Sequence, residues 1–258
     1  MFKRNYKENI ESKIFHAISN CCDDKKIECY AIGGFVRDLI IGEKSAKDID
    51  ILVVGNGIEI AKQTAEKLKI KSKITVFKNF GTAMFKYNGF DIEFVGTRKE
   101  SYNKSSRNPV VKPGTLDDDL NRRDFTINTL GISLNKKSWG DLLDKFNGIK
   151  DLENKIIKTP LEPKQTFSDD PLRMLRAARF ASQLNFEIDL NSFNGLISEK
   201  ERIKIISPER ISEEINKIIM TSKPSIGFKI LESTGLLDII LPELTDLKGI
   251  EEIEGQKH

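Results

Sequence analysis

The sequence predicts an α+β protein with two parts, residues 1–159 and residues 160–258. Up to Thr159, short apolar runs are interrupted by Gly and Asn and alternate with helical patterns, which is typical of strands interleaved with helices. After Thr159, apolar residues recur at three- and four-residue spacing, which predicts helices throughout. The proline-containing segment Pro160–Pro163 separates the two patterns and marks the boundary between them.

In the first part, the apolar runs predict strands or strand-like cores, and the helical spacing predicts interleaved helices. The strands are Cys29–Ile32, Ile49–Val54, Ile74–Phe77, Ala83–Tyr87, Phe90–Val95 and Thr126–Leu134. The helices are Glu8–Ser19, Phe35–Ile41 and Ile58–Leu68, the last of them capped by Asn56-Gly57. Asn88-Gly89 indicates a β-hairpin turn between Thr82–Tyr87 and Phe90–Val95. The polar segment Ser101–Pro113 is predicted to be a mobile loop.

The second part is predicted to be all-helical. Its helices are Pro171–Leu184, Asn191–Ser198, Pro208–Met220, Pro224–Ser233 and a short Leu236–Leu241. A polar capping residue and a proline mark three of the starts, at Ser168-Asp169-Asp170-Pro171, Ser207-Pro208 and Ser222-Lys223-Pro224.

The composition narrows the possible chemistry. His16 and His258 are the only histidines, so a serine triad or a three-histidine metal cage lacks its parts. Cys21, Cys22 and Cys29 lack the spacing of a zinc or redox motif and are expected to be buried, reduced thiols. No apolar stretch approaches the ~20 residues of a membrane span, and the N-terminus does not read as an export signal. We therefore expect a cytoplasmic protein without a membrane partner, whose chemistry depends on carboxylates and arginines.

The net charge of +3 gives no general sign of a polyanionic partner, but the charge is unevenly distributed. Residues 61–112 carry twelve Lys or Arg against four Asp or Glu. Such a stretch is most often a solvated face, yet it also suits a phosphate backbone, and both interpretations stay open.

Two glycines and two aspartates form the first candidate site. Gly33 and Gly34 lie between a predicted strand and a predicted helix, where backbone N–H groups can approach a phosphate. Asp48 and Asp50 are two residues apart on the next predicted strand, so their carboxylates share one face. Two like charges there favour a cation, and hard oxygens suit Mg²⁺. The plainer alternatives are a turn that merely ends a strand and a strand edge with solvated aspartates.

A third carboxylate is available on the strand predicted at Phe90–Val95. Asp91 and Glu93 share a face there, and a neighbouring strand could bring one of them to the same metal ions. Two-metal phosphoryl transfer uses carboxylates to hold ions that activate the attacking hydroxyl and neutralise the leaving pyrophosphate. The sequence of this strand does not indicate whether Asp91 or Glu93 is the third carboxylate.

Four blocks in fixed order resemble the class II tRNA nucleotidyltransferases and bacterial poly(A) polymerases of the polymerase-β superfamily, and CCA-adding enzymes most closely. The blocks are Gly33-Gly34-Phe35-Val36-Arg37-Asp38, Asp48-Ile49-Asp50, Arg122-Arg123-Asp124-Phe125-Thr126-Ile127-Asn128, and Asp169-Asp170-Pro171-Leu172-Arg173 with its continuation to Phe180. The resemblance covers about Tyr30 to Leu247. It implies a nucleotidyltransferase head with a small mixed sheet and flanking helices, residues 1–159, followed by an all-α neck, residues 160–258. It also implies template-independent addition of C, C and A to the tRNA 3′ end from CTP and ATP, with Mg²⁺ as cofactor.

By this resemblance the matching positions take individual roles. Asp48 and Asp50 bind the catalytic Mg²⁺ ions, and Glu93 is preferred as the third carboxylate. The nucleotide-binding residues are Gly33, Gly34, Arg37, Arg122, Arg123, Asp124, Asn128, Asp170, Arg173, Arg176 and Arg179. Asp170 and Arg173 correspond to the pair that hydrogen-bonds the incoming base, whose exocyclic amino group C and A share. Asp144, Gly148, Asp151 and Leu152 resemble a flexible element after the sheet, and Ser207–Ile211 resembles a block that supports the neck.

Two departures from the family pattern matter. Asp169 stands where the family usually has Glu, which shortens the reach of that carboxylate. The chain also stops at His258, whereas relatives continue into a helical body and tail or an HD phosphohydrolase domain, so we expect a fragment or a reduced form with head and neck only. The alternatives are a poly(A) polymerase, an enzyme that adds only CC or only A, and a non-catalytic RNA- or nucleotide-binding module. The paired charges of Asp48 and Asp50 argue against the last. Nucleotide order and oligomeric state are not fixed by the sequence.

Overall fold

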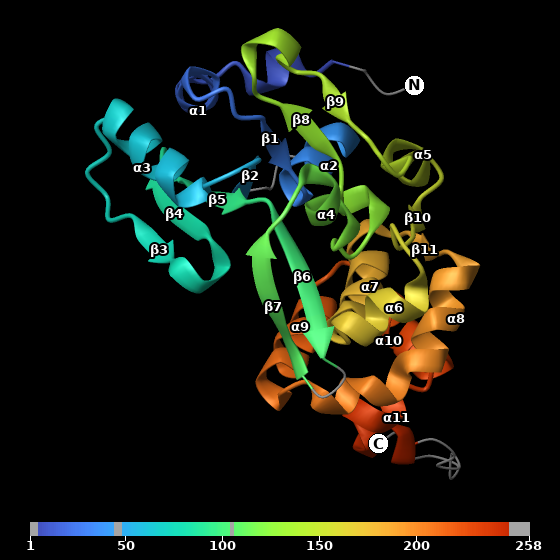
Figure 1. Cartoon of the computed structure of the whole chain (residues 1–258). Coiled ribbons are helices and arrows are strands. Elements are labelled where there is room, and N and C mark those ends of the chain that lie inside the picture. The colour runs from blue at the N-terminus through green and yellow to red at the C-terminus, as the bar shows by residue number, and fades with distance from the viewer. Residues whose placement is uncertain (1–4, 44–47, 104–105, 248–258) are drawn as a thin grey trace. The chain divides into compact units, whose positions relative to one another are not determined.

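A computed structural model describes residues 5–43, 48–103 and 106–247 of the 258-residue chain. The chain divides into two compact units (Figure 1). The first contains Met1–Tyr102, Pro109–Asn154 and Lys158–Pro160, and the second contains Asn103–Asn108, Lys155–Ile157 and Leu161–His258. The C-terminal segment on which the expectation of a fragment depends lies outside the described residues.

Residues up to Glu153 form nine strands and five α-helices within the described ranges. The strands are β1 (Cys29–Ile32), β2 (Asp48–Val53), β3 (Thr75–Phe77), β4 (Thr82–Tyr87), β5 (Phe90–Gly96), β6 (Arg98–Asn103), β7 (Ser106–Pro113), β8 (Gly131–Ser133) and β9 (Leu142–Leu143). The helices are α1 (Lys13–Asp24), α2 (Gly34–Ile41), α3 (Gly57–Lys67), α4 (Leu116–Asn121) and α5 (Gly148–Glu153). Short 3₁₀ turns are η1 (Lys7–Ile10), η2 (Lys78–Phe80), η3 (Thr126–Asn128) and η4 (Lys136–Ser138).

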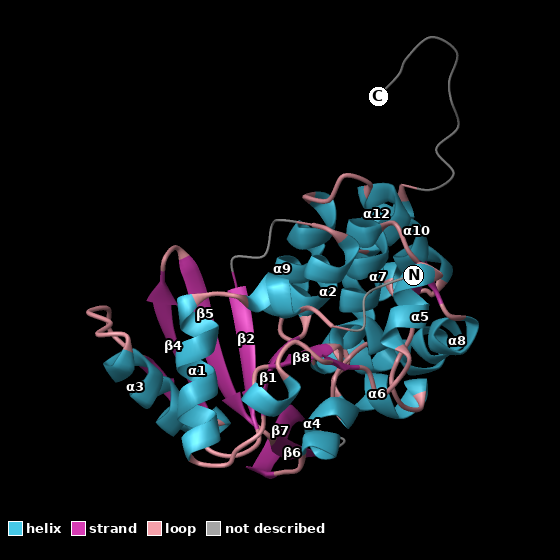
Figure 2. Ribbon diagram, turned by 90° about the horizontal axis from the view of Figure 1, so that it is seen from above, coloured by secondary structure: helices cyan, strands magenta, loops and turns pink. Residues whose placement is uncertain are grey.

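Seven of these strands form one mixed sheet in the order β3-β4-β5-β2-β1-β8-β9. β2 and β5 pair in parallel, and β2 pairs with β1 antiparallel. Along β2, Ile49 and Ile51 are buried on one face and alternate with Asp48 and Asp50 on the other. α3 contacts β4 and β5 and packs beside α1, so these two helices cover one face of the sheet (Figure 2). The predicted α+β fold with a small mixed sheet is confirmed.

The opposite face of the sheet has its own apolar cluster next to the aspartates. Ile32 and Leu52, on the neighbouring strands β1 and β2, pack with Leu120 of α4, and all three are almost completely buried. Leu120 anchors the C-terminal end of α4 to this face. The residues that follow α4 are thereby held close to Asp50.

Most of the predicted strands and helices are confirmed, including the Asn88-Gly89 hairpin, in which both turn residues have positive φ. Two predictions for this part are wrong in detail. The helix expected at Glu8–Ser19 is interrupted and restarts at Lys13, because Ser12 has an extended backbone. The apolar run Thr126–Leu134 forms a strand only at Gly131–Ser133, because its first residues fold into the turn η3. A short buried apolar run does not reveal its conformation by periodicity alone.

The mobile loop predicted at Ser101–Pro113 is also wrong. β6 and β7 form a two-stranded sheet over most of this segment, and Lys104 and Ser105 lie outside the described residues. Its strands are mainly polar, so an apolar alternation pattern could not find them. Thr97 directly precedes β6, and its Oγ1 donates to the carbonyl of Gly114, just after β7, at 2.7 Å. This hydrogen bond connects the two ends of the hairpin.

The second unit is mainly helical. Its helices are α6 (Pro163–Asp169), α7 (Leu172–Leu184), α8 (Leu190–Glu199), α9 (Pro208–Ile219), α10 (Pro224–Ser233), α11 (Leu237–Ile240) and α12 (Pro242–Asp246), with a 3₁₀ segment η5 (Lys200–Ile205). α7 packs against α9 and α10 and forms the centre of the unit. The sequence missed α6 and α12, and it missed the short parallel pair of β10 (Ile156–Ile157) and β11 (Glu187–Ile188), so the expectation of an all-helical part is corrected.

The three cysteines and the hydropathy of the helices agree with the sequence. Cys21, Cys22 and Cys29 are buried and unpaired, as predicted. Burial raises the pKa of the Cys21 thiol, which keeps it protonated. Within residues 5–43, 48–103 and 106–247, no helix is long and apolar enough to cross a membrane.

We predict that Gly57→Ala lowers the free energy of unfolding by about 1–3 kcal/mol. A Cβ at Gly57 would lie 2.7 Å from the backbone nitrogen of Gly96 and 2.9 Å from the carbonyl carbon of Val95, so α3 would have to move away from β5. Gly34→Ala is a matched control, because Gly34 also begins a helix but its Cβ would meet only Arg37 Nη2, at 3.7 Å. Urea denaturation measures both variants, and equal stabilities would contradict the prediction.

Candidate active site

The carboxylates singled out in the sequence lie on two neighbouring strands. The parallel register of β2 and β5 places Asp48 opposite Asp91 and Asp50 opposite Glu93. Directly opposed residues project from the same face of a sheet, so all four carboxylates lie on the face that also carries Leu52. Asp48 is exposed, whereas Asp50 and Glu93 are half-buried.

Asp91 and Glu93 differ in their partners. Lys86 Nζ on β4 lies 3.4 Å from Asp91 Oδ1, so that carboxylate already has a cation beside it. Glu93 forms no ion pair with another described residue, and Asp50 is the acidic group that influences it most. This difference favours Glu93 over Asp91 as a third metal-binding carboxylate, which stays a prediction.

The carboxylates repel one another in a partly buried site. Burial raises the pKa of the Asp50 carboxyl; the Arg123 guanidinium opposes this rise, and the negative charge of Asp48 adds to it. Burial also raises the pKa of Glu93, and the charge of Asp50 adds to that rise. A cation between these side chains would relieve both the repulsion and the desolvation.

The donor set fits a hard divalent cation that shares its ligands with a substrate. Carboxylate oxygens are the ligands that Mg²⁺ prefers, and Mg²⁺ usually keeps water and phosphate oxygens as further ligands. Within the described part of the chain, no three His, Cys, Asp or Glu side chains already converge as a metal cluster. Asp48 and Asp50, with Glu93 opposite, would therefore need oxygen ligands from water or from a bound phosphate.

The Gly33-Gly34 turn lies directly against Asp50. Gly33 has a φ of +79°, and a Cβ placed on it would lie 3.4 Å from Asp50 Oδ2 and 3.4 Å from Arg123 Nη1. Any other residue would therefore be strained and would also fill the space between the carboxylate and the guanidinium. α2 begins at Gly34, so the N–H groups of its first turn open beside the carboxylates.

Arg37 and Asn128 hold the two sides of this turn together. Arg37, 4% exposed, donates from Nη1 to Asn128 Oδ1 at 2.9 Å and from Nε to Asp38 Oδ1 at 2.8 Å. Asn128 Nδ2 in turn donates to Asp124 Oδ1 at 3.0 Å. The structure thus brings Arg37, Asp124 and Asn128 together as a buried hydrogen-bond chain that links α2 to η3.

Arg122 and Arg123 are organised by a residue that the sequence analysis did not select. Asp119 is fully buried, and its two oxygens accept from Arg122 Nε at 2.9 Å and from Arg123 Nη2 at 3.2 Å. Arg122 Nη1 also lies 3.4 Å from Glu100 Oε1 on β6. The i, i+3 and i, i+4 spacing from Asp119 to the two arginines was the available sequence signal, because such pairs meet on a helix.

The segment from Asp144 to Leu152 packs against η3 and stabilises it. The Asp144 carboxylate accepts from the N–H of Gly148 at 2.7 Å, and the Asp151 carboxylate accepts from Thr126 Oγ1 at 2.6 Å. A Cβ on Gly148 would lie only 2.5 Å from the carbonyl oxygen of Thr126. These contacts fix the turn that carries Asn128.

In the second unit, the candidate residues Asp170, which ends α6, and Arg173 and Arg179, on α7, have separate environments. Asp170 accepts through Oδ1 from the N–H of Leu172 at 3.2 Å, and Arg173, 7% exposed, donates from Nη1 to the carbonyl of Thr166 at 3.2 Å. Arg179 Nε lies 2.8 Å from Glu214 Oε2 on α9. The spacing therefore does not give one uniform basic stripe.

Arg176 and Arg179 share an aromatic neighbour. Their guanidinium carbons lie 5.3 Å and 4.1 Å from the centroid of the Phe180 ring. A ring face stabilises such cations without neutralising them. Arg176 is half-buried at this position.

Comparison with known proteins connects this arrangement to a family. Residues 29–158, half of the chain, match the family described as "Poly A polymerase head domain", and residues 185–248 match "Probable RNA and SrmB- binding site of polymerase A". The chain belongs to the poly(A) polymerase head domain family. This confirms the resemblance inferred from the sequence blocks. Nucleotidyltransferases of the polymerase-β type generally use divalent metal ions, in agreement with the carboxylates of β2 and β5.

Individual relatives and a solved structure are similar to most of this chain. An A-adding tRNA nucleotidyltransferase from Aquifex aeolicus is 37% identical over 206 residues, which are 80% of this chain and 24% of the relative. A CCA-adding enzyme from Lactobacillus helveticus is 35% identical over 90% of this chain and 55% of its own length. The crystal structure of a tRNA nucleotidyltransferase complexed with a primer tRNA and an incoming ATP analogue superposes with a TM-score of 0.73 and 30% identity, covering 87% of this chain and 62% of that one. The chain thus spans between a quarter and about half of these two curated relatives.

We predict that Asn128→Asp destabilises this poly(A) polymerase head domain by about 2–4 kcal/mol at neutral pH. The substitution would replace the amide that donates to Asp124 with a second buried carboxylate. The loss should shrink towards pH ~4, where one carboxyl is protonated. Asn88→Asp, in an exposed turn that accepts Asp, is the control. Urea titrations at both pH values test this, and an Asn128→Asp variant as stable as the parent would contradict it.

Proposed function

We propose that this chain carries the catalytic head and neck of a template-independent tRNA nucleotidyltransferase that adds C, C and A to the tRNA 3′ end. In this reaction the 3′-hydroxyl of the RNA attacks the α-phosphate of CTP or ATP, a phosphodiester bond forms, and pyrophosphate leaves. The head would correspond to residues 1–159 and the neck to residues 160–258. Three buried thiols suit a reducing compartment and support the cytoplasm as the location.

The observation that carries this proposal is the set of groups around Asp50. Its carboxylate lies beside Asp48 on β2, opposite Glu93 on β5, and against the Gly33 turn with Arg123 on the other side. A surplus of negative charge next to a glycine turn and a helix start is suited to a cation and a phosphate together. A module that only bound RNA would not need such a pair of repelling carboxylates.

Asp48 and Asp50 would hold Mg²⁺, with Glu93 as a third carboxylate. Bound there, the ion would supply a lowered pKa for the attacking hydroxyl and neutralisation of the leaving pyrophosphate. The N–H of Gly34, at the start of α2, is suited to a phosphate oxygen, whereas the N–H of Gly33 already donates to the carbonyl of Leu130 at 3.1 Å. Arg123 lies close enough to Asp50 to balance its charge and to contact a phosphate at the same place.

Asp124, Asn128 and Arg37 would position the nucleotide through their shared hydrogen-bond chain. Arg37 is enclosed and already bonded to Asp38 and Asn128, so its main contribution is to fix the Gly33-Gly34 turn. Asn128 and Asp124 lie on the turn that follows Arg123 and are suited to a ribose hydroxyl. Arg122 would add positive charge for phosphate beside Arg123.

Asp170 and Arg173 are proposed to read the base. A carboxylate accepts from the exocyclic amino group that C and A share, and a guanidinium donates to ring or carbonyl acceptors. Arg173 is held by the carbonyl of Thr166 in the middle of α6, which limits its freedom and suits a fixed template. Arg176, over the Phe180 ring, is a further candidate for RNA phosphate.

A second candidate is an enzyme that adds only the terminal A. It is favoured by one observation, the 37% identity to the A-adding enzyme of Aquifex aeolicus over 80% of this chain. The carboxylate site suits both enzymes equally, so the added sequence has to distinguish them. Long A-tails would instead indicate a poly(A) polymerase.

We predict that Asp48→Ala/Asp50→Ala lowers nucleotide incorporation by about 10³-fold or more, because the cation would lose its protein ligands. The assay is extension of a tRNA lacking CCA, with Mg²⁺ and each NTP alone or CTP with ATP; a tRNA ending in CC tests A addition. Calorimetric titration with Mn²⁺ should show that the variant also loses metal binding. Asp24→Ala/Glu66→Ala removes the same charge from exposed positions and should retain activity. Full activity in the Asp48→Ala/Asp50→Ala variant would contradict the proposal.

We predict that Arg173→Ala reduces the preference for CTP and ATP over UTP and GTP by about 100-fold, because hydrogen bonds to a charged group contribute about 1.5–3 kcal/mol each. The measurement is kcat/KM for the four nucleotides on the same primer. Arg210→Ala, on another helix of the unit, serves as the control. An equal loss for all four nucleotides would indicate that Arg173 only supports the fold.

A further inference from the structure

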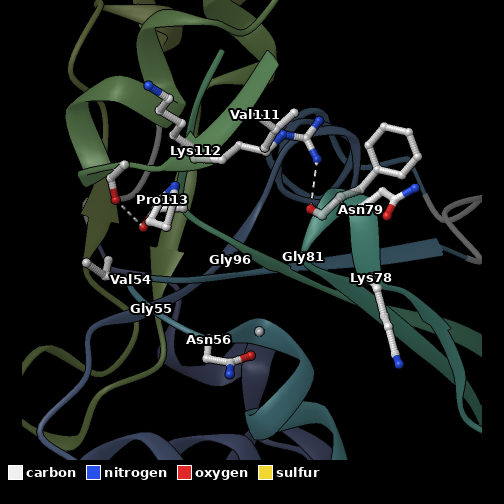
Figure 3. Close-up of a pocket in the computed structure, with 15 residues that line it drawn as sticks. Val54, Gly55, Asn56, Lys78, Asn79, Gly81, Gly96, Val111, Lys112 and Pro113 are labelled. Carbon is white, nitrogen blue, oxygen red and sulfur yellow. Dashed lines mark hydrogen bonds between the residues drawn. The ribbon is translucent and has the colours of Figure 1, made fainter. Parts of the chain in front are cut away.

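A cavity of about 580 Å³ opens in the first unit, away from the carboxylates (Figure 3). Its walls are residues 54–57 after β2, 78–81 before β4, 96–98 at the end of β5, and 111–114 at the end of β7. Because β2 and β5 run in parallel from Asp48 and Asp91 towards these walls, the cavity lies beyond the far ends of the two strands, with Asp50 and Glu93 between it and Asp48 and Asp91. Arg98 in its lining still acts on Glu93, because its charge lowers the pKa of that carboxyl. We call this cavity the glycine pocket, after its lining residues Gly55, Gly57, Gly81, Gly96 and Gly114.

The charge of the glycine pocket is entirely positive among its lining residues. Lys78, Arg98 and Lys112 line it, and no Asp or Glu does. Lys78 and Lys112 are exposed and form no ion pair with another described residue, and they come from different walls, η2 and β7 (Figure 3). Arg98 is neutralised by Glu100 at 2.8 Å, so the two lysines are the cations available to a ligand.

The remaining lining combines an aromatic face with accessible backbone. Phe80 is 51% exposed. The backbone carbonyl of Phe80 accepts a hydrogen bond from Arg98 Nη1 at 3.2 Å, which fixes the position of this wall. Beside it, Asn79 presents an exposed amide, and a Cβ on Gly81 would meet nothing within 4 Å. A flat ring, free lysines and an amide are the groups with which proteins bind single nucleotides and single-stranded RNA.

The packing of the glycines explains how the pocket forms. A Cβ on Gly96 would lie 2.5 Å from the carbonyl oxygen of Gly55, so β5 and the segment after β2 touch through their backbones. At Gly55 and Gly96 the wall therefore consists of backbone alone. The volume lies within the range of small-molecule sites, about 300–1,000 Å³.

We propose that the glycine pocket binds a nucleoside phosphate at a second site, separate from the carboxylates. Lys78 binds the phosphate, Phe80 stacks on the base, and Asn79 hydrogen-bonds the base edge or the ribose; Lys112, on the opposite wall, adds positive charge to the pocket (Figure 3). The ligand is either a free nucleotide or one unit of a single-stranded RNA, since both present the same phosphate and base. This site takes no part in nucleotide transfer, so its existence does not depend on the function proposed above.

Photo-crosslinking of the full chain tests the site directly. The probes are 8-azido-ATP and a short single-stranded RNA that contains 4-thiouridine, and crosslinked peptides are located by mass spectrometry. Labelling is expected in the peptides that contain residues 78–81 and 111–114, and it should persist in the Asp48→Ala/Asp50→Ala variant. Labelling by the azido nucleotide alone identifies a free nucleotide as the ligand, and labelling by the RNA alone identifies an RNA segment.

Two sets of variants make the outcome decisive. Lys78→Glu/Lys112→Glu should lower labelling of the pocket by about 10-fold or more, whereas Lys62→Glu/Lys71→Glu, the same charge change at exposed positions elsewhere, should not. Phe80→Ala should lower it by about 5-fold or more through lost stacking, and Phe77→Ala, an exposed ring outside the pocket, should not. The phenylalanine pair decides if circular dichroism shows that the lysine variant does not fold. Crosslinks confined to the peptides of Gly33–Arg37 and 122–128, or equal losses in variants and controls, would overturn the proposal.

Discussion

The buried carboxylate of Asp119 is the interaction on which the candidate site depends. A fully buried ionised group is stable only when its charge is balanced and its oxygens are hydrogen-bonded. Arg122 and Arg123 provide that balance, one on each oxygen. Since Arg123 is held in this way, its guanidinium is presented to Asp50 and to the Gly33 turn instead of turning to solvent. The geometry at the carboxylates is therefore set from α4, an element outside the two strands that carry the candidate metal ligands.

The scaffold also explains how the carboxylates stay close together although their negative charges repel one another. Asp48, Asp50 and Glu93 share one face of the sheet, and burial together with mutual repulsion raises the pKa of the inner two carboxyls. Arg123 compensates from one side only. The sheet cannot relax, because Ile49 and Ile51 anchor β2 in the core on its other face. A folded scaffold thus holds charges in an arrangement that is unfavourable until a cation is bound, as expected of a preorganised electrostatic site.

The sequence predicted the parts of this architecture that are local. Three such features depend on only a few neighbouring residues, and the structure confirms them. They are the alternation of apolar and acidic residues in β2, the Asn88-Gly89 turn and the glycines at the start of α2. Pairing between distant segments could not be predicted in the same way. The register that sets Glu93 opposite Asp50 depends on how two strands align, so the residues alone left Asp91 as an equal choice. The polar hairpin of β6 and β7 lacked an apolar pattern, and Asp119 appeared only as one of three adjacent aspartates.

The arginines of α7 show why spacing by itself does not assign a function. Arg173, Arg176 and Arg179 recur every three residues, but their surroundings differ, although Arg176 and Arg179 share the Phe180 ring. Glu214 is 3% exposed on α9 and pairs with two cations, Lys217 of the same helix and Arg179, so that arginine joins α7 to α9. Arg173 is tied to the last turn of α6, where Asp170 ends that helix and accepts from the first turn of α7. If this helix reads a base, the α6–α7 junction is the place where a carboxylate and a guanidinium are held together by backbone, whereas the far end of α7 is committed to packing.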